Sequence, residues 1–282
     1  MQIFKTFSAL QQQLARSPKI LGFVPTMGAL HSGHLSLVKK AVAENEHVVV
    51  SIFVNPTQFN NPTDLEKYPR TLEKDLQALS IFADQLSVVC PSVEEMYGDR
   101  LSADHYELGK LEEVMEGKMR PGHFQGVATI VEKLFKAVRP QRAYFGEKDF
   151  QQLMVIRHLV ELKAIPVEII QCPIERESNG LARSSRNELL SLNARKNAGQ
   201  IYAVLQQAKA DYLSQEFTYE ELKERALKAL SQIPDSQVEY FVIANEHDLA
   251  EIQSLHNARS VRAFVAVNVE KIRLIDTMNY QE

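Results

Sequence analysis

Residues 20–34 read Ile-Leu-Gly-Phe-Val-Pro-Thr-Met-Gly-Ala-Leu-His-Ser-Gly-His. The stretch begins as a short apolar strand that stops at Pro25, and residues with helical spacing follow from Leu35. Gly28 and Gly33 permit tight turns between the two elements. A helix that begins directly after a strand presents free N–H groups and a positive dipole end, which bind anions. The sequence therefore predicts a strand–turn–helix unit with an anion site in its turn.

Two histidines lie three residues apart in this turn. At the start of a helix, His31 and His34 would lie on the same side. Their imidazoles can donate hydrogen bonds to phosphate oxygens that gain charge during attack on phosphorus. Half of a zinc site and a purely structural helix start remain as alternatives, although no third ligand follows at metal spacing. The context resembles the adenylate-forming nucleotidyl transferases related to class I aminoacyl-tRNA synthetases.

The alternation of strand and helix continues over the first two thirds of the chain. Apolar runs at Val48–Val54, Leu86–Cys90 and Val167–Cys172 predict further strands, and Ala143–Phe145 predicts a brief one. Helical spacing separates them at Leu35–Ala43, Thr71–Phe82, Val127–Val138 and Phe150–Leu162. Such alternation is typical of parallel strands joined by right-handed crossovers. We predict a Rossmann-like α/β domain over residues 1–173, with helices on both faces of a parallel sheet.

The pattern changes after Pro173, where we place a hinge. Residues 174–187 are polar and rich in turn formers. Two helical patterns and three strand candidates follow, at Ala194–Leu213, Tyr219–Leu230, Val238–Ile243, Val261–Val267 and Ile272–Ile275. This order predicts a smaller C-terminal α/β lid domain over residues 174–282.

Composition excludes several classes of protein. The 282 residues are 45% hydrophobic and carry a formal net charge of −4, so no general basic surface exists for nucleic acid or a membrane. No apolar run approaches the roughly 18 residues of a membrane span, and the N-terminus lacks the regions of a signal peptide. Cys90 and Cys172 end apolar runs without motif spacing, which favours reduced thiols in a cytoplasmic protein.

Polar residues follow the strand predicted at Val48–Val54. Ligands of open parallel sheets bind beyond the carboxyl ends of the strands. There Asn55 and Gln58 could donate hydrogen bonds to a carboxylate or hydroxyl group, and Phe59 offers an apolar wall. An ordinary Asn-Pro turn is the alternative. Asp75, on the next helical pattern, could hold a magnesium ion beside phosphates or could be a solvated helix acid.

A second glycine turn follows the strand predicted at Ala143–Phe145. Lys148 stands at the start of the next helix as a compact cation suited to phosphate oxygens, although a surface lysine is the alternative. Asp149 could bind a ribose hydroxyl or cap the helix. Gln152, one turn further, could face the same substrate as Gln58.

A loop rich in hydroxyl groups lies at the predicted domain junction. Ser184 and Ser185 precede Arg186, and together they offer charge-assisted hydrogen bonds to phosphate. Such a loop at a hinge can close over ATP and exclude water. A serine-rich linker is the alternative.

These clusters together resemble the pantothenate synthetase (pantoate–β-alanine ligase) family. The matching stretches, in the family's order, are Val24–His34, Ser51–Phe59, Tyr68–Thr71, Arg120–Val127, Phe145–Gln152 and Gly180–Asn187. The resemblance implies magnesium-dependent condensation of pantoate with β-alanine through a pantoyl-adenylate, with release of AMP and pyrophosphate from ATP. It also implies a Rossmann-like domain with a C-terminal lid, in a homodimer.

The resemblance also implies roles for single residues. The catalytic groups that it implies are His34, His31, Lys148, Ser184, Ser185 and Arg186. The implied ATP contacts are Met27, Gly28, Ala29, Leu30, His31, Ser32, Gly33, His34, Gly146, Glu147, Lys148, Asp149, Glu175, Arg183, Ser184, Ser185 and Arg186. Gln58 and Gln152 would bind the substrates, with Asn55 and Phe59 beside them. Glu175 and Arg183 stand where the family usually has apolar residues.

Other functions remain open from the sequence. A nucleotidyl transferase acting on a phosphate-bearing acceptor should have a cationic acceptor pocket, whereas Asn55, Gln58 and Gln152 are neutral. A tRNA-charging enzyme is disfavoured because the chain from Ala194 shows no basic surface. A nucleotide-binding regulator without activity is disfavoured because every phosphate-facing cluster is present.

Overall fold

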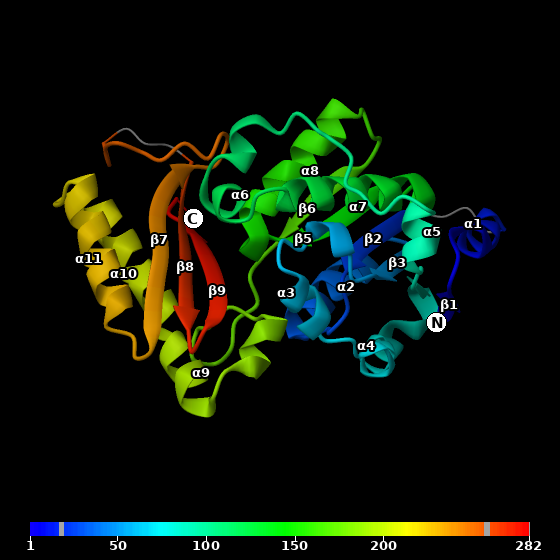
Figure 1. Ribbon diagram of the computed structural model, residues 1–282, viewed down its shortest axis with the longest axis horizontal. Coiled ribbons are helices and arrows are strands. Elements are labelled where there is room, and N and C mark those ends of the chain that lie inside the picture. The colour runs from blue at the N-terminus through cyan, green and yellow to red at the C-terminus, as the bar shows by residue number, and fades with distance from the viewer. Residues whose placement is uncertain (17–19, 257–259, 282) are drawn as a thin grey trace. The chain divides into compact units, whose positions relative to one another are not determined.

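The computed structural model describes residues 1–16, 20–256 and 260–281 (Figure 1). The chain divides into two compact units, Met1–Gly146 with Gln151–Cys172 and Glu147–Phe150 with Pro173–Glu282. The boundary predicted between residues 173 and 174 differs from this division by one residue. It also misses the four-residue segment that leaves the first unit and joins the second.

The first unit contains a six-stranded parallel sheet with the strand order β1-β4-β3-β2-β5-β6. Its strands are β1 Gln2–Phe4, β2 Leu21–Thr26, β3 His47–Ile52, β4 Leu86–Val89, β5 Arg142–Gly146 and β6 Glu168–Cys172. From β2 the chain first adds strands on one side, at β3 and β4, and later on the other side, at β5 and β6. The carboxyl ends of β2 and β5 therefore flank the switch point at which ligands of such sheets bind.

Helices cover both faces of this sheet. The helices before β6 are α1 Phe7–Ala15, α2 Ser32–Glu44, α3 Pro62–Lys67, α4 Leu72–Leu79, α5 Val93–Tyr97, α6 Met115–Met119, α7 His123–Val138 and α8 Phe150–Leu162. Short 3₁₀ helices are η1 Pro56–Gln58, η2 Ser80–Gln85, η3 Gly109–Glu112 and η4 Glu147–Asp149, the last of which belongs to the second unit. Val24 of β2 packs with Val38 of α2, whereas the neighbouring Phe23 meets Phe135 of α7. Because successive strand residues point to opposite faces, α2 and α7 lie on opposite sides of the sheet. The predicted Rossmann-like fold is confirmed.

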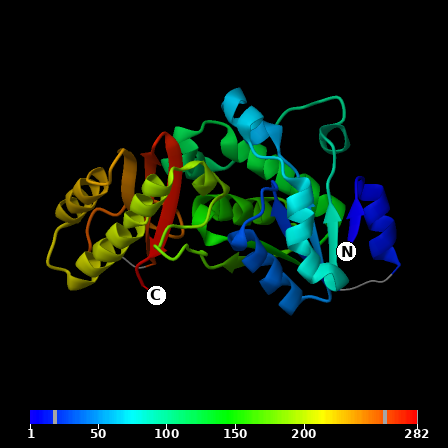
Figure 2. The ribbon, with the colours of Figure 1, turned by 90° about the horizontal axis from the view of Figure 1, so that it is seen from below.

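The second unit contains an antiparallel sheet with the order β7-β8-β9. Its elements are η5 Ser185–Leu189, α9 Leu192–Ala198, α10 Gln200–Ser214, α11 Tyr219–Ser231, β7 Ser236–Asn245, β8 Val261–Val269 and β9 Ile272–Asn279. Figure 2 shows α10 and α11 side by side along this sheet. Leu205 of α10, Leu222 of α11 and Val265 of β8 share one buried core. The prediction of a smaller C-terminal α/β domain architecture is thus confirmed.

Some elements differ from the sequence prediction. The helix predicted at Ala194–Leu213 is two helices, α9 and α10, which meet at Gly199. A Cβ atom on Gly199 would lie 2.5 Å from the carbonyl oxygen of Asn179, so no larger residue fits there. The helix predicted to begin at Val127 begins at His123 instead.

The first strand and helix were not predicted from the sequence. β1 is a three-residue edge strand that pairs with β4, and strands this short leave little periodic signal. α1 begins after Thr6, whose side chain accepts a hydrogen bond from the amide of Ala9 at 3.3 Å. That cap is the signal by which the helix could have been found. Of the helices in the described ranges, none combines the length and apolar character that crossing a bilayer requires.

Candidate active site

The turn between β2 and α2 is anchored by Asp75 of α4. This carboxylate is 2% exposed and accepts hydrogen bonds from the amides of Ala29 and Leu30, at 3.0 and 2.8 Å. The hydroxyl group of Thr71 donates a third hydrogen bond at 3.2 Å. Gly28 has a φ of 80°, and a Cβ atom there would lie 3.0 Å from the Asp75 carboxylate. The close approach and the left-handed backbone explain why glycine occupies this position.

His31 and His34 cap the start of α2 and face each other. The Nδ1 atom of His31 accepts from the amide of Gly33 at 3.1 Å, and that of His34 accepts from the amide of His31 at 3.3 Å. The ring centroids lie 4.0 Å apart. A backbone amide can only donate, so each neutral ring carries its proton on Nε2. Both imidazoles therefore present hydrogen-bond donors near the positive end of α2.

Gln58 and Met27 bring together the carboxyl ends of the neighbouring strands β3 and β2. The Nε2 atom of Gln58 lies 2.9 Å from the Sδ atom of Met27. Its Oε1 atom accepts from Nδ2 of Asn55 at 3.1 Å. The ring of Phe59 meets the ring of Tyr68 edge-on, with centroids 5.6 Å apart. Of the residues predicted after the second strand, Gln58 thus contacts the first cluster directly, at Met27.

Arg120 and His123 also reach this part of the first unit. The Nδ1 atom of His123 lies 2.7 Å from the carbonyl oxygen of Gln58, and its Nε2 atom lies 3.1 Å from a guanidinium nitrogen of Arg120. Because the carbonyl only accepts and the guanidinium only donates, the proton of the neutral ring is on Nδ1. The sequence showed both residues in a matching stretch, but no local pattern indicates a contact with a residue so distant in the chain.

Two adjacent glutamines at the start of α8 have different environments. Gln151 is buried and accepts from the amide of Glu116 at 3.0 Å, while its nitrogen donates to the carbonyl oxygens of Leu111 and Val114 at 2.8 and 3.0 Å. Gln151 therefore holds the segment before α7. Gln152, which was predicted to bind substrate, is half-buried and remains the candidate of the two.

The turn that carries Lys148 belongs to the second unit. Arg262 of β8 is 1% exposed, and its guanidinium lies 3.3 Å from the carboxylate of Glu147 and 4.2 Å from the ring centre of Phe150. The Nζ atom of Lys148 lies 3.8 Å from the Asp149 carboxylate, which is largely exposed. The buried arginine thus fixes both ends of the turn, and the lysine lies between them.

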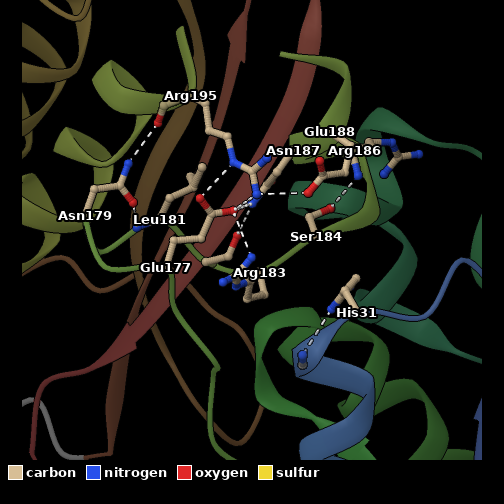
Figure 3. A network of polar contacts seen from close by, with 12 residues as sticks. His31, Glu177, Asn179, Leu181, Arg183, Ser184, Arg186, Asn187, Glu188 and Arg195 are labelled. Atoms are coloured by element: carbon tan, nitrogen blue, oxygen red, sulfur yellow. Dashed lines mark hydrogen bonds and ion pairs between the residues drawn. The ribbon is translucent and has the colours of Figure 1, made fainter. Parts of the chain in front are cut away.

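The loop of Ser184, Ser185 and Arg186 is held by a network around Glu177 (Figure 3). The Glu177 carboxylate accepts two hydrogen bonds from Arg195 and one from Asn187, each at 2.8 Å. Its bonds with the Arg195 guanidinium hold the pKa of Glu177 below its usual value. Because Asn187 lies within the 3₁₀ helix η5, Ser185–Leu189, its bond to Glu177 ties this loop to the network.

The two positions that depart from the family pattern lie side by side. The amide of Arg183 donates to the carbonyl oxygen of Glu175 at 2.8 Å. The side chain of Arg183 reaches toward Glu177, with 3.6 Å between its Nη1 atom and Oε1. Glu175 is exposed. The main chains of these residues are thus joined by a hydrogen bond, and the Arg183 side chain lies toward Glu177.

Asp75, which the sequence suggested as a metal ligand, and both cysteines lie among the described residues. Over residues 1–16, 20–256 and 260–281, no group of three or more histidine, cysteine, aspartate or glutamate side chains is arranged to hold a metal ion. Asp75 is not the solvated helix acid considered from the sequence, because its buried carboxylate accepts hydrogen bonds from the amides of Ala29 and Leu30. Cys90 and Cys172, the two cysteines of the chain, form no disulfide with each other.

Comparison with known proteins identifies the family. The model of the pantoate–β-alanine ligase family matches residues 2–279. The pantothenate synthetase of Christiangramia forsetii is 46% identical over 284 residues, which cover 99% of each chain. That of Flavobacterium psychrophilum is 47% identical over 261 residues, which cover 93% of this chain and 92% of the relative.

Solved structures agree with these sequence matches. The pantothenate synthetase of Thermus thermophilus superposes with a TM-score of 0.92 and 41% identity, over 100% of each chain. The pantoate–β-alanine ligase of Francisella tularensis, solved with β-γ ATP and β-alanine, gives a TM-score of 0.81 and 37% identity, over 100% of this chain and 98% of that one. The chain therefore belongs to the pantoate–β-alanine ligase family.

Proposed function

We propose that this ligase joins pantoate to β-alanine in two steps through a pantoyl-adenylate. In the first step, a carboxylate oxygen of pantoate attacks the α-phosphorus of ATP, and the bond to pyrophosphate breaks. In the second step, the free amine of β-alanine attacks the activated carbonyl, AMP leaves with the electron pair of the anhydride bond, and the nitrogen releases one proton as the amide forms. Activation is needed because the unactivated carboxylate would have to expel oxide.

The arrangement of His31 and His34 is the observation that carries the proposal. In each ring the Nδ1 atom accepts a hydrogen bond from a backbone amide, and the Nε2 atom is a hydrogen-bond donor at the start of α2. Donors fixed beforehand stabilise charge that grows on phosphate oxygens during attack, at little reorganisation cost. Pyrophosphate is a good leaving group, so this electrostatic role suffices for His34 without a full proton transfer.

The remaining ATP contacts are proposals from the family's pattern. In the first unit they are Met27, Gly28, Ala29, Leu30, Ser32, Gly33 and Gly146; in the second they are Glu147, Lys148, Asp149, Glu175, Arg183, Ser184, Ser185 and Arg186. Lys148 and Arg186 supply positive charge, and the two serines supply hydroxyl donors. We assign contacts through the main chain to Glu175 and Arg183, whose backbones are paired. The lid function of the second unit is part of the same proposal.

The acid is bound by neutral groups in this proposal. Gln58 and Gln152 donate to oxygens of pantoate and align the β-alanine amine, Asn55 orients Gln58, and Phe59 forms an apolar wall. Amide donors bind a carboxylate without cancelling the charge that makes it a nucleophile. Alignment of two reactants can supply a large share of the barrier reduction.

Magnesium enters as part of the MgATP substrate in this proposal. The ion typically keeps several waters and binds substrate phosphates, which demands few protein ligands. Asp75 serves in this proposal as the anchor of the turn between β2 and α2, since both of its oxygens accept amide hydrogens. A homodimer, which the family pattern implies, and a cytoplasmic location, which suits the two thiols, complete the proposal.

Isotope exchange tests the proposed reaction. With MgATP and pantoate but without β-alanine, labelled pyrophosphate should enter ATP, because the first step is reversible. Addition of β-alanine should then yield AMP and pantothenate in equal amounts. A nucleotidyl transferase acting on a different acceptor would show no exchange that depends on pantoate, and that result would overturn the proposal.

A further inference from the structure

The side-chain amide of Asn55 can be oriented in only one way. Asn55 is 1% exposed, and one end of its amide lies 3.1 Å from the carbonyl oxygen of Gly126. A carbonyl oxygen only accepts, so this end must be the nitrogen. The other end lies 2.5 Å from the hydroxyl group of Tyr97 and 3.1 Å from that of Thr57, and both hydroxyls can donate. The backbone carbonyl and the two hydroxyls therefore agree on the orientation.

The orientation of Asn55 determines that of Gln58. The Nδ2 atom of Asn55 also lies 3.1 Å from one end of the Gln58 amide, which must accept and is therefore Oε1. The nitrogen of Gln58 then points the other way, where it lies beside the thioether of Met27. That nitrogen carries two hydrogens, and a thioether is only a weak acceptor. Gln58 thus has donor capacity left for a ligand on the Met27 side.

The surroundings of Tyr97 favour its hydroxyl group as a hydrogen-bond donor to Asn55. It lies at the end of α5, far from Asn55 in the sequence, and is buried with its ring 6.5 Å from that of Phe53. Burial raises the pKa of the Tyr97 hydroxyl, so the group is protonated at neutral pH. The Nζ atom of Lys133 lies 5.3 Å from the centre of the ring. The hydroxyl is therefore fixed in place and in protonation state.

We propose that Tyr97 is a positioning residue, which acts through Asn55 to hold the Gln58 nitrogen toward the bound acid. The inference rests on the proposed assignment of Gln58 to the acid. A flipped Gln58 would turn the lone pairs of Oε1 toward the acid, where they would repel a carboxylate. The bond chain therefore makes Gln58 a pure donor and selects acids with an acceptor oxygen at this place. An analogue that carries an ammonium group there should be rejected.

Steady-state kinetics of Tyr97→Phe tests the inference. Loss of the hydroxyl should raise the KM for pantoate roughly 3- to 10-fold, the range of one neutral hydrogen bond, and leave the KM for ATP within about twofold. In a Gln58→Ala background, the same change should have no further effect, because the group being positioned is gone. Equal increases in both KM values, or effects that simply multiply in the double variant, would overturn the inference.

Tyr106→Phe is the matched control. Tyr106 is a buried tyrosine of the same unit, and its hydroxyl donates to Glu132 at 2.6 Å, away from Asn55. We expect this variant to leave both KM values unchanged. If Tyr97→Phe does not fold, Thr57→Ala removes the other hydroxyl on Asn55 and should show the same split between the two KM values. A wild-type protein without pantoate-dependent exchange would overturn the proposed function; an active wild type with an unaltered Tyr97→Phe variant would overturn only this inference.

Discussion

His34 accepts the amide of His31 on Nδ1, so its Nε2 atom is a donor. The spacing of the two histidines predicted that they lie on one side of a helix start, and the rings are indeed 4.0 Å apart. The sequence could not predict which nitrogen carries the proton. That choice depends on hydrogen bonds from the backbone, which exist only once the turn has formed.

Replacement of His34 tests the role of this donor. His34→Ala should lower the rate of adenylate formation by about 100- to 1000-fold, the loss typical of one transition-state donor. His34→Gln, which can place an amide nitrogen near the lost Nε2 atom, should recover part of the rate. Single-turnover release of pyrophosphate measures the step. The exposed His105 offers a control, since His105→Ala should keep the wild-type rate. An undiminished rate in His34→Ala would remove the histidine from the mechanism.

Asp75→Asn separates the anchoring role from a metal role. Asparagine has one acceptor oxygen, so the amide of Ala29 or Leu30 loses its partner. We expect the free energy of unfolding to fall by about 1–3 kcal/mol and the KM for ATP to rise. The magnesium concentration for half-maximal activity, measured at fixed ATP, should stay at the wild-type value. A marked increase in that concentration would support a metal ligand instead.

At the scale of elements, the turn from Glu147 to Phe150 depends on a strand far away in the sequence. Arg262 of β8 contacts both residues and also donates to Glu246 at 2.7 Å. A glycine turn before a helix was visible in the sequence, and it predicted Lys148 as a phosphate ligand. The arginine carried no local signal, because buried charges are recognised only when their partners are in place.

Arg262→Met should therefore disturb the turn as well as the sheet. The change leaves Glu147 and Glu246 without the shared cation, and loss of one partner of a buried pair costs about 3–5 kcal/mol. We expect a lower melting temperature and a raised KM for ATP with little change in the KM for pantoate. Arg262→Lys keeps the positive charge but loses the guanidinium nitrogens that bond Glu147 and Glu246 separately, so its stability should lie between those of Arg262→Met and the wild type. Identical ATP kinetics in a stably folded Arg262→Met protein would separate the turn from ATP binding.

The strands and helices themselves followed from the periodicity of apolar residues. The buried run at Val48–Val50 has no polar alternation, which is how a strand covered on both faces reads. Elements without such a pattern were missed, as with β1, which has three residues at the sheet edge. The break at Gly199 was missed because a glycine within a helical pattern is often tolerated. Its close contact with Asn179 is a tertiary feature.

At the scale of the whole molecule, the proposed ATP ligands are distributed over both compact units. His31 and His34 belong to the first unit, while Lys148 and the loop around Ser185 belong to the second. The sequence predicted these clusters because each follows a strand end or a turn. It could not predict that Lys148 belongs to the second unit, since the segments before and after Glu147–Phe150 in the sequence both belong to the first unit.

The stability of the molecule should depend on Glu177 at neutral pH and less so in acid. Its folded pKa lies below the unfolded value of about 4.3, so the stabilisation is complete above that pH and is lost as the pH falls through the folded pKa. Glu177→Gln should lower the free energy of unfolding by about 1–3 kcal/mol at neutral pH. The difference from wild type should shrink once the pH falls below about 4.

Urea unfolding at several pH values measures this dependence. Glu224→Gln, an exposed change on α11 of the same unit, is the control and should follow the wild-type curve. A Glu177→Gln deficit that stays constant through the acidic range would show that the network stabilises the fold by shape and not by charge.

Because Glu147–Phe150 belong to the second unit, they also limit where the chain can be divided to make fragments or chimeras. A fragment that ends at Cys172 would keep Glu147 but lose Arg262, and it would expose the buried ring of Phe150. In a chimera whose C-terminal half comes from a relative, residues 147–150 of this chain would pack against the relative's residue at the position of Arg262. The four residues should therefore be exchanged together with the C-terminal half, as one inherited block.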